Sequence, residues 1–195
     1  SFSAGTSVNT VAVKGNDMFI AGGSSLASIG LSGANTVGVG SVNAGTSSYT
    51  VWRQAVQVNT RALWLKAANF RITGSAPSDA LQNVGLYVDG VKAGNNAMMT
   101  MTNGSNYLSF DMSGAPLSLS TGAHTFEVRG DIVKGSSFSF TVSLQQASDI
   151  MVTDPQIGVN LAMCGNTSCT TSFSASTAGT ISIGTGSFTG VNDPA

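Results

Sequence analysis

The side chains that could do acid–base chemistry are scarce in this sequence. His124 is its one histidine and Glu127 its one glutamate. A hydrolytic triad needs a base held beside a nucleophile by an orienting acid, and His124 is the single candidate base. It shares a strand face with Phe126 and Val128, which indicates a histidine at the edge of the core. Glu127 alternates to the solvent face beside Arg129, where we expect it to form an ion pair. A catalytic role in a glycosidase is less favoured, because that chemistry needs two carboxylates.

Metal and phosphate sites are not indicated either. Calcium needs several oxygens at close spacing, and the densest acids, Asp149 and Asp154, form no Asp-x-Asp-x-Asp run. A structural zinc site needs four ligands, and two cysteines with one distant histidine do not supply them. No glycine-rich loop follows a strand and opens a helix as a phosphate site requires. We therefore expect no enzyme, no catalytic residue, no metal and no cofactor.

The low charge restricts the partners. The chain has 8 basic and 9 acidic residues among 195, so no basic patch could release counterions from a nucleic acid. Two long uncharged stretches, 18–52 and 155–192, are interrupted throughout by Gly, Ser, Thr and Asn. Their apolar content is too low for a membrane-spanning helix. We expect neither a nucleic-acid partner nor a membrane span.

The two cysteines lie close together in the sequence Cys-Gly-Asn-Thr-Ser-Cys (164–169). Turn-forming Gly165 and Asn166 would let Cys164 and Cys169 meet across a tight loop, so a disulfide is favoured over two free thiols. A disulfide predicts an oxidising, extracellular location. Asn103 and Asn166 fit the N-glycosylation pattern. A chain this rich in Asn, Ser and Thr contains such matches by chance, so glycosylation stays open.

Apolar residues alternate with polar ones along most of the chain, which predicts strands. Residues 137–144 are the clearest case, with Phe and aliphatic side chains on one face and Ser and Thr on the other. Asp89-Gly90 predicts a tight hairpin turn. Leu63 and Phe70 are out of phase on one strand, which predicts a bulge near Ala67 and Ala68. Many short strands without a helical pattern predict an all-β sandwich or barrel.

Four sequence motifs carry a resemblance to a known family. They are Leu-Trp-Leu-Lys-Ala-Ala-Asn-Phe-Arg-Ile-Thr (63–73), Leu-Gln-Asn-Val-Gly-Leu-Tyr-Val-Asp-Gly (81–90), Gly-Ala-His-Thr-Phe-Glu-Val-Arg-Gly-Asp-Ile (122–132) and Phe-Ser-Phe-Thr-Val (138–142). Their order over about residues 62–152 resembles the Ig-like β-sandwich repeats of long secreted surface proteins of ultra-small candidate-phylum bacteria. The resemblance implies an Ig-like antiparallel β-sandwich and a structural or adhesive role. It supplies no catalytic residue.

A short internal sequence repeat, here called the echo, suggests how the chain is divided into modules. Residues 36–41 (Thr-Val-Gly-Val-Gly-Ser) resemble residues 180–185 (Thr-Ile-Ser-Ile-Gly-Thr). If the echo marks the start of successive modules, one module lies between the two segments. We expect extra N-terminal strands over 1–35, an Ig-like sandwich over 36–162, and a Cys loop, linker and C-terminal strand over 163–195.

These features favour a self-assembling extracellular subunit of a surface filament or array over other functions. Open edges on so neutral a sheet are templates for pairing, so we expect copies of the chain to join head to tail by strand addition. The predicted donor is the C-terminal strand, with Ile181, Ile183 and Phe188 inserted into the neighbour. The rival donor is the N-terminal strand, with Val8, Val11 and Val13.

The alternative function is an adhesin module that binds carbohydrate or protein. It would need a cluster of outward-facing aromatic side chains. The sequence offers four candidates for such a surface, with glycans as the partner: Trp52, Trp64, Tyr87 and Tyr107.

Overall fold

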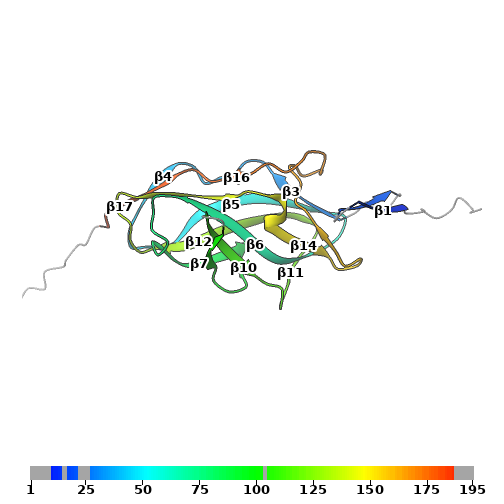
Figure 1. Ribbon diagram of the computed structural model, residues 1–195, viewed down its shortest axis with the longest axis horizontal. Helices are drawn as coiled ribbons and strands as arrows, with labels where there is room; N and C mark the ends of the chain where they lie inside the picture. The colour runs from blue at the N-terminus through cyan, green and yellow to red at the C-terminus, as the bar shows by residue number, and fades with distance from the viewer. Residues whose placement is uncertain (1–9, 15–16, 22–26, 103–104, 187–195) are drawn as a thin grey trace, which may run out of the picture.

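The alternation of apolar and polar residues produces two sheets that face each other across one apolar core. The computed structural model describes residues 10–14, 17–21, 27–102 and 105–186. Within them, the regular structure is all strands apart from the short 3-10 helix η1 (Ala147–Asp149). The predicted all-β sandwich is confirmed, and Figure 1 shows its elongated shape.

The first sheet, here the back sheet, contains five strands in antiparallel pairs. β7 and β8 are joined by Asp89 and Gly90, whose φ angles are 52° and 81°. Two successive positive φ values are those of a type I′ turn, so the predicted hairpin is confirmed. In spatial order the strands are β3 (Ser28–Ser32), β5 (Thr46–Asn59), β12 (Gly122–Ile132), β7 (Leu81–Val88) and β8 (Val91–Ala93).

The second sheet, the front sheet, is organised around the long strand β6 (Leu63–Gly74). β10 and β11 pair with one edge of β6, and β13 and β14 pair with the other. All pairs in it are antiparallel except that of β17 with β4, which is parallel. Its other strands are β4 (Gly40–Asn43), β9 (Met98–Thr102), β10 (Ser105–Asp111), β11 (Leu117–Leu119), β13 (Ser139–Leu144), β14 (Ile150–Asp154), β15 (Val159–Leu161), β16 (Ser176–Thr177) and β17 (Ile181–Gly184).

A bulge in β6 keeps its apolar side chains in the core. Leu65 is opposite Val152 of β14 and Ala67 is opposite Met151, so Lys66 is the extra residue. Leu65 and Phe70 are both fully buried in spite of their odd separation. The bulge that the sequence predicts is present, one residue earlier than expected.

An aromatic row crosses the core between the sheets. The ring centroid of Trp52 on β5 is 4.8 Å from that of Phe70 on β6, and Phe70 is 6.0 Å from Phe110 on β10. Trp52 Nε1 donates a hydrogen bond of 3.0 Å to the carbonyl oxygen of Ser176. The prediction that Trp52 is a surface aromatic is wrong: 1% of it is exposed, because it shares the inward face of β5 with Val56.

The terminal segments differ from the expected division of the chain. β3 belongs to the back sheet, and β16 and β17 belong to the front sheet, so the expected boundaries at 36 and 162 fall inside the sandwich. β1 (Thr10–Lys14) and β2 (Asp17–Ala21) form a separate two-stranded antiparallel sheet. Figure 1 shows this hairpin beyond one end of the sandwich, whereas β4 and β17 lie at the opposite end.

Truncation of Phe70 tests the aromatic row. Phe70 is fully buried between two aromatic rings, so we expect Phe70→Ala to lower the free energy of unfolding by about 3–5 kcal/mol in urea titrations. Phe138→Ala is the matched control, because Phe138 is exposed and its truncation should change stability by less than about 0.5 kcal/mol. Equal losses from the two variants would contradict the packing described.

Candidate functional site

His124 fastens the hairpin turn between β7 and β8 to the start of β12. Its Nδ1 lies 2.6 Å from Asp89 Oδ2, and its Nε2 lies 2.8 Å from the carbonyl oxygen of Ser120. Asp89 Oδ1 also accepts a 2.8 Å hydrogen bond from the amide of Thr125. Burial acts to raise the pKa of Asp89, but the hydrogen bonds from Thr125 and His124 outweigh it and leave that pKa below its ordinary value. Both ring nitrogens of His124 are thus engaged in holding the turn.

Glu127 lies at the centre of a charged cluster on the outer face of the back sheet. It pairs with Arg53 across the strands and with Arg129 on its own strand. The Arg129 guanidinium lies 4.6 Å from the centroid of the Tyr87 ring. These side chains cover Glu127 so well that only 3% of it is exposed, although its direction is the expected outward one.

The cluster also sets the ionisation of Glu127. Burial tends to raise the pKa of its carboxyl, because the charged form loses water. Hydrogen bonds and positive charge from Arg129 and Arg53 act more strongly, so the pKa of Glu127 lies below its ordinary value. Glu127 is therefore a charged anchor for two arginines, and the ion pair with Arg129 that the sequence predicts is present.

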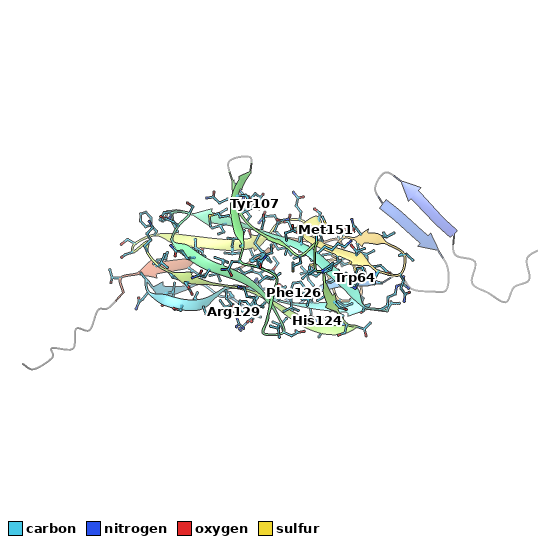
Figure 2. All side chains as sticks on the ribbon, turned by 90° about the horizontal axis from the view of Figure 1, so that it is seen from below. Trp64, Tyr107, His124, Phe126, Arg129 and Met151 are labelled. Carbon is cyan, nitrogen blue, oxygen red and sulfur yellow. A yellow bond between two sulfur atoms is a disulfide. The ribbon has the colours of Figure 1, made fainter. Side chains whose placement is uncertain are left out.

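The four aromatic residues predicted for one binding surface are not brought together. Trp52 is in the core, and the half-buried Tyr87 lies on the back sheet against Arg129. Trp64 on β6 is 42% exposed and Tyr107 on β10 is half-buried, both on the front sheet. Figure 2 shows Trp64 and Tyr107 at separate places along the sandwich.

A groove lies beside two sheet edges that have no partner strand in the part of the chain that the structure describes. β3 pairs with residues 55–59 of β5, so residues 46–52 of β5 pair with β12 alone. β4 pairs with β17 alone. The space here called the edge groove has a volume of about 470 Å³. It lies between residues 37–40, which lead into β4, and residues 46–50 of β5, with Arg53 also in its lining.

The residues of the edge groove leave these edges open. Its lining consists of Val, Gly, Thr, Ser and Tyr side chains apart from Arg53, which is occupied by Glu127. Natural proteins protect an open edge with lysine, proline or a covering loop. None of the groove's lining residues is lysine or proline, and Val39 is 84% exposed. Sequence reasoning missed this site because it depends on β3 ending before it covers the whole of β5.

The C-terminal strand is part of its own chain's sandwich, which corrects the predicted donor. β17 pairs with β13 and with β4, and Ile181 and Ile183 are buried in the core. These two side chains are therefore not free to enter a neighbour, and a chain cut before Ala178 would lose core packing rather than stay folded. Phe188, the third predicted donor residue, lies outside the described residues.

The N-terminal strand, which is the alternative donor, belongs to neither sheet of the sandwich. Val11 and Val13 belong to β1, which pairs with β2 and with no other strand in the described part of the chain. Val8 lies outside the described residues.

Cys164 and Cys169 are joined in a disulfide, with their Cα atoms 5.0 Å apart. Next to it, the chain pairs with β3: the amide of Leu31 donates to the carbonyl of Cys164, and the amide of Cys164 donates to that of Ile29. The disulfide loop thus covers part of the β3 edge. The side-chain amide of Asn166 is hydrogen-bonded to Thr170, the residue that follows the loop. Asn103, the other glycosylation candidate, lies outside the described residues.

Comparisons with known proteins give no family. No family model and no curated protein matches the chain. Among solved structures, AvmM, which catalyses macrocyclisation in alchivemycin A biosynthesis, is 11% identical with a TM-score of 0.33, covering 92% of this chain and 98% of its own. BcpA, the major pilin subunit of Bacillus cereus, is 10% identical with a TM-score of 0.23, covering 80% of this chain and 47% of its own.

A variant of the same pilin subunit is 8% identical with a TM-score of 0.27, and the match covers 92% of this chain. This chain spans about half the length of the pilin, 48% and 47% in the two structures. All of these TM-scores are below 0.5, so the likenesses carry no argument about function.

In the described residues there is no cluster of three or more His, Cys, Asp or Glu side chains that could hold a metal ion. The same part of the chain has no helix long and apolar enough to cross a membrane.

Replacement of Glu127 tests the charged cluster. We expect Glu127→Gln to lower the free energy of unfolding at pH 7 by about 1–3 kcal/mol, because the hydrogen bonds from Arg53 and Arg129 lose their charged acceptor. The pKa of Glu127 is lower in the folded chain than in the unfolded one, where it is about 4.3. Its contribution is therefore complete above pH 4.3 and is lost as the pH falls through the folded value. Denaturant titrations should show the two proteins converging below about pH 4; a constant difference would contradict this account.

Removal of the disulfide gives a second test. The loop is short, so we expect Cys164→Ser with Cys169→Ser to lose about 2 kcal/mol of stability. The wild-type protein in dithiothreitol should show the same loss, and the double variant should not respond to reductant. If reductant leaves the denaturation midpoint of the wild type unchanged, the loop is not held by this bond.

Proposed function

We propose that this chain is a non-catalytic structural subunit that joins copies of itself head to tail in an extracellular filament or array. The observation that carries the proposal is the edge groove, a space of about 470 Å³ between the open edge of β5 at residues 46–50 and the segment 37–40 that leads into β4. An added strand would gain main-chain hydrogen bonds from such an edge and could insert alternate side chains between the sheets.

The donor in this proposal is the N-terminal hairpin β1–β2. A two-stranded sheet is at best marginally stable alone in water, so added pairing would stabilise it. The hairpin lies at the opposite end of the molecule from β4 (Figure 1), and Gly40 of β4 lines the edge groove. A contact between two different ends is not self-complementary, so its repetition builds an open fibre instead of a closed dimer.

Two further features support this proposal. The disulfide fits an oxidising, extracellular location. The segments that resemble the surface repeats of candidate-phylum bacteria fall on β6, β7, β12 and β13, which form the centres of both sheets. We propose a relationship to those repeats on this basis.

A matched pair of valine substitutions tests the acceptor. We expect Val39→Lys to remain folded with an unchanged melting temperature, because Val39 is 84% exposed, but to form no filaments in negative-stain micrographs. Val91→Lys is the control: Val91 is 70% exposed on β8 at the far edge of the back sheet, and this variant should polymerise normally. Filaments from the Val39→Lys protein would contradict the edge groove as acceptor.

Deletion of residues 1–21 tests the donor. The hairpin pairs with no sandwich strand among the described residues, so the shortened chain should fold and stay monomeric by light scattering. It retains the edge groove and should therefore cap wild-type chains and shorten their filaments when mixed with them. Polymerisation of both the deletion and the Val39→Lys variant would show that strand addition is wrong.

A further inference from the structure

Arg71 differs from the other arginines in having no acidic partner. Arg53 and Arg129 pair with Glu127, and Arg61 pairs with Asp154. Among the described residues no carboxylate lies within ion-pair distance of Arg71. Its Nε is buried without a hydrogen-bond partner, as is the Nε of the ion-paired Arg129. A guanidinium without an acidic partner in its own chain can pair with a ligand that carries negative charge.

Arg71 lies beside a polar hollow on the outer face of the front sheet. Tyr107 of β10 is its partner in the strand register, and the residues next to them, Phe70 and Leu108, point into the core. The hollow has a volume of about 280 Å³ and is lined by Tyr107, Asn69, Thr100, Ser109, Gln146 and Asp149. Figure 2 shows Tyr107 near the base of the projecting β9–β10 hairpin.

We propose that this hollow, with Arg71, binds a carboxylated sugar residue of an acidic polysaccharide. A guanidinium can hold a carboxylate with two parallel hydrogen bonds. The Tyr107 ring offers an apolar face against which the C–H face of a sugar ring can pack. Asn69 and Gln146 supply amide groups for its hydroxyls, as a small-ligand site requires a few placed polar groups.

Asp149 sets the orientation of the sugar. Its Oδ2 accepts hydrogen bonds from the amides of Gln145 and Gln146, at 2.9 and 2.8 Å. It therefore lies fixed in the hollow as a negative acceptor that attracts hydroxyl donors and repels a second carboxylate. The sugar's acid group is directed to Arg71 and its hydroxyls to Asp149. The inference does not depend on the assembly mode, because the edge groove is lined by other residues.

The test uses the ¹⁵N-labelled full chain and an oligosaccharide of alternating glucuronic acid and N-acetylglucosamine. We expect NMR shift changes at the amides of Asn69, Tyr107 and Gln146. A neutral N-acetylglucosamine oligomer of the same length should bind at least about tenfold more weakly, since it lacks the charged contact. Arg71→Gln should weaken binding of the acidic oligosaccharide by about tenfold or more and remove its preference over the neutral one.

Two controls separate binding from folding. Lys66→Gln makes the same charge change on the same strand outside the hollow and should keep both the affinity and the preference. Arg71→Gln should not lower the melting temperature, because Arg71 has no ion pair to lose within the described chain. The proposal is overturned if no acidic oligosaccharide binds, if Arg71→Gln binds it as well as the wild type does, or if a glutamate-rich peptide binds the hollow instead.

Discussion

The contact between Trp52 and Phe70 is the interaction on which the arrangement of both sheets depends. It joins the middle of β5 to the middle of β6 with 4.8 Å between ring centroids. Trp52 also reaches the chain beyond the disulfide loop, because its Nε1 donates to the carbonyl of Ser176. That bond holds residues 176–177 beside β13, and β17 follows directly and pairs with the same strand. The C-terminal strand is thus held in its own sandwich, and the edge of β5 opposite β12 at residues 46–52 and the outer edge of β4 have no partner strand in the described part of the chain.

The local features of the fold could be predicted from the sequence because their causes are local. Positive φ values at Asp89 and Gly90 fix the β7–β8 turn, and the phase change between Leu65 and Phe70 requires a bulge. The burial of Trp52 could also have been predicted, since an even spacing of four from Val56 places both side chains on one face of the strand. The burial of Glu127 could not be predicted in this way, because it results from Arg53, a side chain on another strand that lies over it.

The role of β17 could not be predicted for a thermodynamic reason. A strand that completes its own chain's sheet makes the same main-chain hydrogen bonds and buries the same side chains as one that completes a neighbour's sheet. Sequence pattern identifies Ile181 and Ile183 as inward-facing, but it does not say inward to which molecule. The difference is set by linker length and by bonds such as that from Trp52 to Ser176, which appear only in three dimensions.

The uneven protection of the sheet edges is the strongest physical reason to connect this fold with assembly. The β3 edge is paired with the chain around Cys164 and held there by a covalent loop. At the far side of the same sheet, β8 is a three-residue strand that carries Lys92. Short strands, lysines and covering loops are the usual defences against edge pairing. By contrast, the edge of β5 opposite β12 at residues 46–52 and the outer edge of β4 have no partner strand in the described part of the chain, and the groove beside them contains neither lysine nor proline. This contrast between protected edges and the open edge of β5, with a groove beside it, is what supports the proposal that the subunit takes up a strand from another chain.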